Sequence, residues 1–130
     1  FVEKLGLEAV ILHEQPNEGR TIIEKLEHHA QAAYAIVLLS PDDTGFPNGS
    51  SNLARARARQ NVILELGMFI GRLGRKRVCV LHKTDVELPS DIHGVLYLPY
   101  RELSGVKADL IREMKAAGLE LDADKAGQAL

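Results

Sequence analysis

The chain has 130 residues, of which 45% are hydrophobic and 26% are charged, and its formal net charge is −2. This length allows one domain, and the composition is typical of a folded globular protein rather than a disordered or fibrous one. The slight acidity and the absence of tryptophan argue against general nucleic-acid binding. No apolar run approaches the roughly 18–20 residues of a membrane helix. A single cysteine, Cys79, indicates a reducing compartment. We therefore expect a cytoplasmic protein with no membrane and no nucleic-acid partner.

The N-terminal part of the chain predicts a helix end, a short strand and a helix. Residues 1–7 look like the last turn of a helix that Gly6 caps, and the apolar triplet 10–12 is typical of a buried strand. Thr21 opens a helix, with Glu24 as its capping-box partner. Five apolar residues of this helix recur at helical spacing and predict a face packed on a sheet: Ile22, Ile23, Leu26, Ala30 and Ala33.

The rest of the chain alternates strands and helices. Residues 34–39 are continuously apolar, as in a strand covered on both faces. A long loop over 40–52 follows, and further patterns predict a helix over 54–73 ending at Gly74, strands over 77–81 and 94–98, and a helix over 103–117. This alternation predicts an α/β fold with a parallel sheet and helices on both faces.

Ligands of such sheets bind at the carboxyl ends of the strands. The loops 14–20, 40–52 and 83–93 each follow a predicted strand, so we expect them to meet at that edge. Because the chain opens on a helix end, we also expect that the first strand of the fold is missing from it. We expect residues 1–121 to form the domain and residues 122–130 a tail or the start of a linker.

Glu65 is the one acidic residue between Asp43 and Asp85, and basic residues surround it in the sequence. It lies in the run VILELGMFI, which predicts a helix that is apolar on nearly every side and buried on more than one face. A carboxylate there is costly unless it is paired or has a chemical task. Two interpretations remain open: a structural ion pair with Arg59, Arg72 or another arginine, and a carboxylate at the rim of a ligand cleft.

Four segments carry a resemblance to a known family. The run RARQNVILELGMFIGRLGRKRVCVL over 57–81 resembles the signature of bacterial TIR-like domains of the predicted nucleotide-binding type, found in STING and other cyclic-nucleotide-activated antiphage effectors. The segments LHEQPNEGRTIIEKLE (12–27), VLLSPDD (37–43) and ELPSDIHGV (87–95) are similar to the same family. The resemblance covers residues 1 to about 121. It departs from the family at the front, where members begin with a strand and a pocket-lining loop.

The resemblance implies a flavodoxin-like TIR fold that cleaves NAD at the nicotinamide–ribose bond when its molecules assemble. The catalytic glutamate of the family maps onto Glu65, and the loop 14–20 corresponds to its BB loop, which contributes to TIR–TIR packing. The implied partners are NAD as substrate, other TIR domains of the same kind, and a linked cyclic-nucleotide-sensing domain outside this chain. No cofactor and no metal are implied.

Cleavage of NAD needs few groups, because nicotinamide leaves as a neutral molecule and requires no general acid. A fixed carboxylate stabilises the positive charge that develops on the ribose, as in glycoside hydrolysis. Arg20, Arg57 and Arg59 are candidate partners of the diphosphate, although each suits a solvated or structural role too. Asn61 either hydrogen-bonds a ribose hydroxyl or caps its helix. Asp42 and its neighbour Asp43 end a strand at the ligand edge or form a turn.

Other signals predict structure rather than chemistry. The adjacent His28 and His29 face different directions and make a poor metal pair, and we expect Cys79 to be a buried apolar residue. The histidines at 13, 82 and 93 are expected to be structural or incidental. The main alternative function is a non-catalytic module for TIR–TIR assembly or nucleotide binding. A phosphoacceptor receiver domain is disfavoured, because the first strand lacks the acidic pair it would need.

Overall fold

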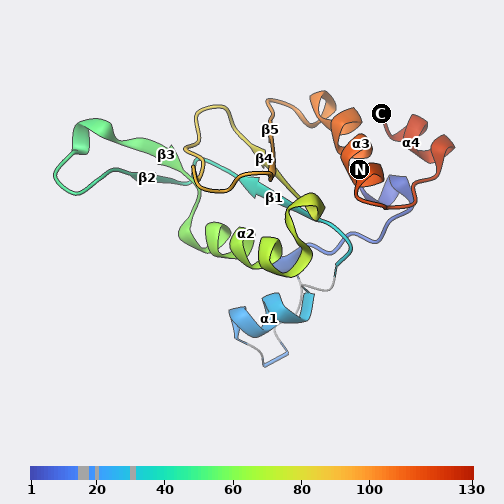
Figure 1. The fold of residues 1–130 in the computed structure, drawn as a ribbon, viewed down its shortest axis with the longest axis horizontal. Helices are drawn as coiled ribbons and strands as arrows, with labels where there is room; N and C mark the ends of the chain where they lie inside the picture. The colour runs from blue at the N-terminus through green and yellow to red at the C-terminus, as the bar shows by residue number, and fades with distance from the viewer. Residues whose placement is uncertain (15–17, 20, 30–31) are drawn as a thin grey trace.

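A three-stranded parallel sheet forms the centre of the molecule (Figure 1). The computed structural model describes residues 1–14, 18–19, 21–29 and 32–130. The strands are β1 (Ala35–Leu39), β4 (Val78–His82) and β5 (Leu96–Pro99), in the order β1-β4-β5. Ala35 of β1 pairs with Val78 of β4, and Cys79 pairs with Leu96 of β5. The prediction of an α/β fold with a parallel sheet is confirmed.

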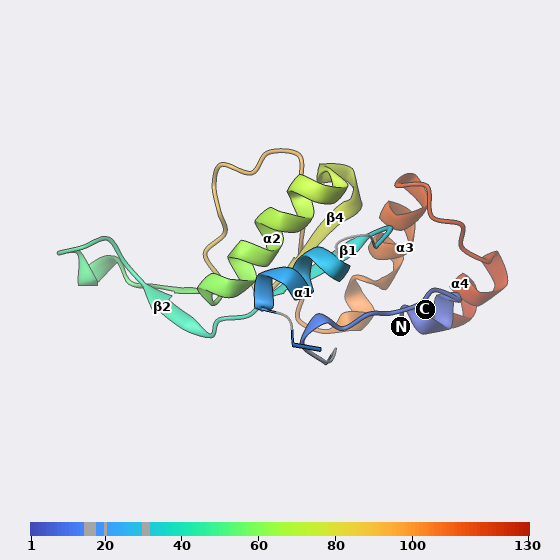
Figure 2. The same ribbon diagram turned by 90° about the horizontal axis from the view of Figure 1, so that it is seen from below.

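Helices cover both faces of this sheet (Figure 2). On one face, helix α2 (Gln60–Leu73) packs against a cluster that includes Val37, Leu39 and Val80. On the other, α3 (Lys107–Ala116) packs with Cys79 and Leu81 in a second cluster. Cys79 is 0% exposed, as predicted from its place in a strand. The alternation of side chains along β4 thus assigns each residue to one of two cores.

Helix α1 (Ile22–His29) begins where the sequence predicts it. The Thr21 hydroxyl accepts a hydrogen bond from the Glu24 amide at 3.2 Å, and the Glu24 carboxylate accepts one from the Thr21 amide at 3.3 Å. This reciprocal pair is the capping box, which satisfies donors that the first helical turn leaves without partners. Most of the apolar face predicted for this helix lies outside the described side chains, but Ala33 is exposed and lies beyond the end of α1 at His29, so the face does not extend to it as predicted.

The strand predicted at 10–12 is wrong. Val10 and Ile11 are 47% and 46% exposed, and residues Leu12–Glu14 form a 3₁₀ turn. An apolar triplet becomes a strand only where a neighbouring strand accepts its backbone hydrogen bonds. β1 lies at one end of the strand order, and no strand among the described residues pairs with its outer edge. Leu38, in the middle of β1, is 53% exposed.

The loop and helix predicted between 40 and 73 differ from the observed elements. β2 (Asp43–Gly45) and β3 (Arg55–Arg57) form an antiparallel hairpin that extends away from the sheet (Figure 1). The predicted helix over 54–73 therefore begins only at Gln60. Its end is confirmed, because the Gly74 amide donates to the Ile70 carbonyl at 2.9 Å. Pairing with β2 satisfies the backbone of residues 55–57 without helical hydrogen bonds.

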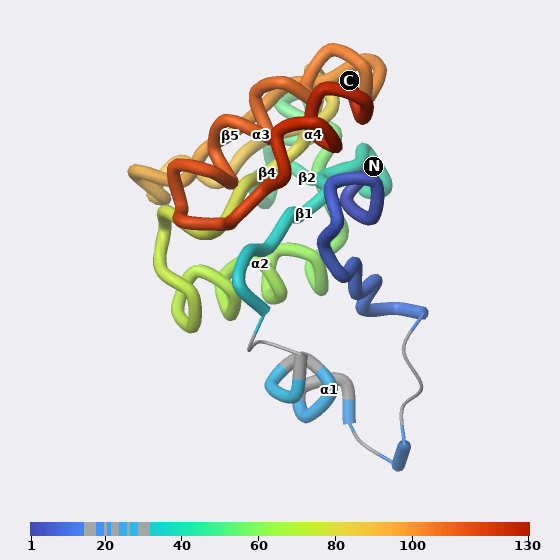
Figure 3. Tube along the Cα trace, turned by 90° about the vertical axis from the view of Figure 1, so that its right-hand side faces the viewer, coloured from blue at the N-terminus to red at the C-terminus, as the bar shows by residue number. Residues whose placement is uncertain are grey.

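The chain termini lie side by side (Figures 1 and 3). Residues 122–130, expected as a tail or linker, contain helix α4 (Ala123–Ala129). Ala126 and Ala129 pack in one cluster with Leu5, whose 3₁₀ turn (Glu3–Leu5) ends at Gly6 with a positive φ of 81°. Two small buried residues were too weak a pattern to predict this helix, which the Asp122 carboxylate caps. The domain boundary at 121 stays a prediction.

The structure also bears on membrane association. Among the described residues, none of the helices has both the length and the apolar character that crossing a bilayer requires.

Candidate functional site

Helix α2 presents Glu65 at the surface of the sheet layer rather than in its interior. Leu66 is the one fully buried side chain of the described helix, and Leu64, two positions earlier, is 51% exposed. Glu65 lies between them and is half-buried. The expectation that α2 is buried on more than one face is therefore wrong. One face of α2 covers the sheet, and Leu64 on its outer face is exposed in the part of the chain that the structure describes.

Burial raises the pKa of the Glu65 carboxyl above its ordinary value, while the positive charges of Arg59 and His13 oppose that rise. Within the described residues, the Glu65 side chain makes no ion pair or hydrogen bond. The structural ion pair with Arg59 that the sequence left open is thus not formed. Glu65 is a carboxylate that is partly withdrawn from water, close to two cationic or ionisable side chains, and free to accept hydrogen bonds from a ligand.

Arg59 and Asp42 form an ion pair at the point where the hairpin meets α2. The Nε of Arg59 lies 3.6 Å from Oδ2 of Asp42, and the two side chains are 68% and 44% exposed. Exposed pairs of this kind contribute about 0–1 kcal/mol to stability, so the pair orients Arg59 more than it stabilises the fold. Asp42 lies three residues beyond the end of β1 at Leu39, and Asp43 is the first residue of β2, so the prediction that the two aspartates end a strand is wrong.

Asn61 lies one helical turn before Glu65, on the same face of α2. The N-cap position of the helix is Arg59, and no side chain caps it. The capping role that the sequence left open for Asn61 is therefore absent, and its exposed amide is available at the Glu65 face. Arg20, the remaining predicted site residue, lies outside the described residues.

The loops that follow β1 and β4 meet, as predicted. The Glu87 amide donates a hydrogen bond to the Ala56 carbonyl at 2.8 Å, and Oε2 of Glu87 lies 3.9 Å from an Arg57 guanidinium nitrogen. The third loop, 14–20, follows no strand, and most of it lies outside the described residues. His13, just before it, is nevertheless close enough to influence the Glu65 carboxyl.

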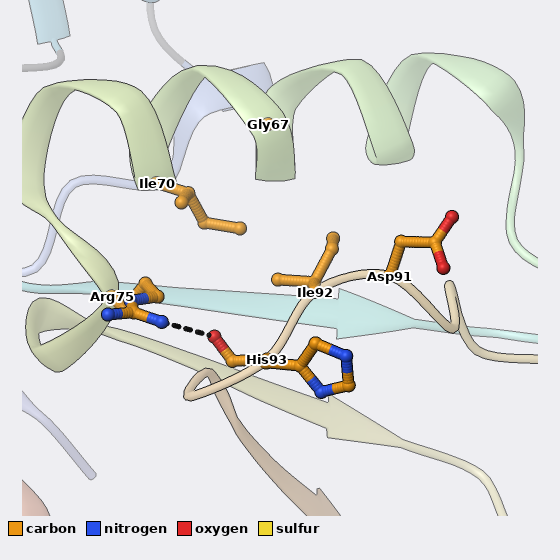
Figure 4. A pocket seen from close by; sticks show the side chains of 6 residues that line it. All are labelled: Gly67, Ile70, Arg75, Asp91, Ile92 and His93. Carbon is orange, nitrogen blue, oxygen red and sulfur yellow. Dashed lines mark hydrogen bonds between the residues drawn. The ribbon is translucent and has the colours of Figure 1, made fainter.

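One hollow lies beside α2 and another beside the hairpin, and Glu65 lines neither. The first, of about 470 Å³, lies between the helix and the loop before β5, beside Gly67, Ile70 and Ile92 (Figure 4). Residues two positions apart in an α-helix point in directions that differ by about 200° around the helix axis. Gly67 therefore lies on the opposite side of α2 from the Glu65 side chain. Arg75 spans one end of this hollow and donates to the His93 carbonyl at 2.9 Å. The second hollow, of about 730 Å³, lies beside the hairpin and includes Arg57 and Glu87.

Sequence reasoning missed Glu87 and the hairpin, and it treated His13 as incidental. A signal for the hairpin was present: Arg55, Arg57 and Arg59 alternate with Ala56 and Ala58, which is the period of a strand and not of a helix. No comparable signal marks Glu87 or His13, because their neighbours are set by how the loops fold back.

The fold is an α/β domain with a parallel sheet, and the comparisons specify its family. A family model described as CAP12/Pycsar effector protein, TIR domain, matches residues 1–102. The chain therefore belongs to this family of bacterial antiphage TIR effectors, which confirms the predicted TIR-like resemblance. The last part of the chain, with α3 and α4, lies beyond the match. The link to STING stays a prediction.

Individual relatives agree with this assignment. The uncharacterized protein YuaY of Escherichia coli (strain K12) is 50% identical over 127 residues, which are 97% of this chain and 42% of that protein. Protein tirC of Dictyostelium discoideum is 38% identical over 112 residues, 78% of this chain and 56% of that protein. The Pycsar effector protein XpPycTIR of Xanthomonas perforans is 49% identical over 53 residues, 39% of this chain and 18% of that protein. The chain thus spans about half the length of the first two proteins.

Proposed function

We propose that this chain is the NAD glycohydrolase domain of an antiphage effector and that Glu65 is its catalytic residue. The observation that carries the proposal is the state of Glu65: half-buried, without an ion-pair partner among the described residues, and with a pKa raised by burial. A carboxyl whose pKa is raised by burial and that has no structural partner is a candidate for a functional site. Membership of a TIR effector family supports the same conclusion.

In the proposed reaction, the bond between the anomeric carbon of the ribose and the nicotinamide nitrogen breaks. The bonding electron pair goes to the nitrogen, so the cationic ring leaves as neutral nicotinamide. Positive charge develops on the ribose, and the Glu65 carboxylate stabilises it. Water then adds to the anomeric carbon and loses a proton, for which the raised pKa of Glu65 makes this carboxylate a suitable acceptor. The reaction needs no metal or bound cofactor, since NAD is the substrate.

The neighbouring residues have binding roles in this proposal. Asn61 donates its amide to a ribose hydroxyl one turn from Glu65, and Arg59 pairs with the diphosphate while Asp42 orients its guanidinium. Arg20 remains a further candidate partner of the diphosphate. The chain acts with other TIR domains of its kind, and a cyclic-nucleotide-sensing domain outside it controls that assembly. The printed name of one relative, CD-NTase-associated protein 12 of Sphingobacterium faecium, is in line with such a system.

The test is nicotinamide release from NAD by the wild-type chain and by Glu65→Gln. Losing an electrostatic stabiliser of the transition state lowers kcat about 10²- to 10³-fold. Glu120→Gln is the matched control, because Glu120 is exposed beyond α3 and lies far from α2 in the sequence. Equal activity of Glu65→Gln and Glu120→Gln would refute the catalytic role.

A second candidate function is a module that assembles with like domains and performs no chemistry. Leu38 on β1 and Leu64 on α2 are 53% and 51% exposed, and assembly with like domains would remove these apolar side chains from water. Sedimentation of the chain separates the two functions when it is combined with the NAD assay. Concentration-dependent association with no nicotinamide release supports the module.

A further inference from the structure

The β2–β3 hairpin borders the second hollow, which Glu65 does not line. It has a volume of about 730 Å³, and its walls include an aromatic ring, an amide, two guanidinium groups and a carboxylate, from Phe46, Asn52, Arg55, Arg57 and Glu87. Phe46 is 47% exposed, so one surface of its side chain is available. A short two-stranded hairpin that extends from a sheet is only marginally stable by itself. Its side chains are therefore available to bind a ligand.

The guanidinium group of Arg57 has a buried N–H donor without a hydrogen-bond acceptor among the described residues. Its guanidinium lies across Gly45 on the opposite strand, where any Cβ would overlap it. Within the described residues its Nε is buried and has no hydrogen-bond partner. A buried donor without an acceptor is costly, and the ion pair to Glu87, at 3.9 Å, does not involve this nitrogen. An anionic oxygen that reached this nitrogen would remove that cost.

Three arginines on β3 and the residues that follow it lie between the hollow and Glu65 in the sequence. Arg55, Arg57 and Arg59 alternate with Ala56 and Ala58, and Ala58 is 2% exposed, so the three guanidinium groups project from the other side of the segment. Alternate residues of an extended chain are roughly 7 Å apart. The arginines therefore form a row, from the hollow at Arg55 to Arg59, whose charge acts on the Glu65 carboxyl. The side chain of Arg55 makes no ion pair with any described residue.

We propose that the hollow beside the hairpin binds the adenosine end of a dinucleotide whose diphosphate lies along this row of arginines. Phe46 stacks on the purine, Arg57 donates its Nε–H to a phosphate oxygen, and Asn52 and Glu87 hydrogen-bond the base edge or the ribose hydroxyls. The other end of the dinucleotide then extends toward Glu65. The identity of the whole ligand as NAD rests on the proposed function, whereas the adenosine site stands on the hairpin itself.

The experiment measures binding of AMP, ADP-ribose and nicotinamide mononucleotide to the full chain by calorimetry. Phe46→Ala is expected to weaken AMP and ADP-ribose about 5- to 150-fold, the usual range for loss of one base–aromatic stack. Gly45→Ala, which displaces the Arg57 guanidinium, weakens ADP-ribose as well. Nicotinamide mononucleotide has no adenosine, so Phe46→Ala leaves its affinity unchanged. Helical circular dichroism checks that each variant is folded.

A matched arginine pair completes the test. Arg55→Ala removes an exposed arginine at the hollow, and Arg77→Ala removes an exposed arginine just before β4, at the opposite edge of the sheet. Loss of ADP-ribose binding in Arg55→Ala but not in Arg77→Ala supports the site. Equal losses in these two variants, or unaltered AMP binding in Phe46→Ala, overturn it. These results are independent of turnover. Release of nicotinamide that depends on Glu65, with adenosine binding insensitive to the hairpin, refutes this site and leaves the proposed function standing.

Discussion

Leu66 tests whether the buried face of α2 holds Glu65 in place. Its side chain is 0% exposed and packs in the cluster that joins α2 to β1 and β4. Leu66→Ala leaves a cavity at a fully packed position, which lowers the free energy of unfolding by about 2–5 kcal/mol. For a domain of this size, at roughly 4 °C per kcal/mol, the melting temperature falls by about 8–20 °C.

Leu64→Ala is the matched control, because the same change is made two residues away on the same helix at a side chain that is 51% exposed. Its effect on the free energy of unfolding stays within about 0.5 kcal/mol. Thermal unfolding followed by circular dichroism at the helical band measures both. Equal losses at the two positions, or a larger loss for Leu64→Ala, would refute the assignment of the buried face and with it the placement of Glu65 at the edge of the helix.

Further predictions concern charge, the thiol, the open sheet edge and the capping box. The pKa of Glu65 is raised in the folded state, so the folded chain binds more protons than the unfolded chain. The ionised Glu65 carboxylate therefore lowers the free energy of unfolding at neutral pH, and this penalty disappears as the pH falls through the raised pKa. Glu65→Gln is therefore expected to raise the melting temperature at mildly alkaline pH and to have no such effect in acid; a gain that persists in acid would contradict this. Burial raises the pKa of the Cys79 thiol to about 12, so a thiol reagent should react with it only at the rate of unfolding. Leu38→Lys places a charge on the exposed edge strand and should lower light scattering of concentrated protein. Thr21→Ala removes one capping bond of α1 and should cost about 1 kcal/mol in chemical denaturation, with an effect below a few tenths arguing against the box.

Local patterns in the sequence predicted the elements whose hydrogen bonds are local and the strands that are continuously apolar. The continuous apolar runs of β1 and β4, the capping box at Thr21 and the end of α2 at Gly74 all belong to this group. The failures need long-range information. The triplet at 10–12 has strand composition but no described strand beside it, and α4 forms because two alanines meet a distant turn at Leu5.

The predictions about the site also divide into those that follow from local sequence and those that need long-range contacts. Glu65 could be singled out because a carboxylate in an apolar helix is costly, and this cost is visible in the sequence alone. The Arg59–Asp42 pair and the approach of His13 depend on where the hairpin and the first residues fold back. The alternation of arginines and alanines over 55–59 did indicate a strand, and the longer helical pattern that follows it concealed the boundary.

The proposed cleavage of NAD by Glu65 requires molecules of this chain to assemble, so nicotinamide release is measured over a range of protein concentrations. Release is expected to rise faster than linearly with the concentration of wild-type chain and to fall at least a hundredfold in Glu65→Gln. Folded Glu65→Gln that releases nicotinamide at the wild-type rate would contradict it.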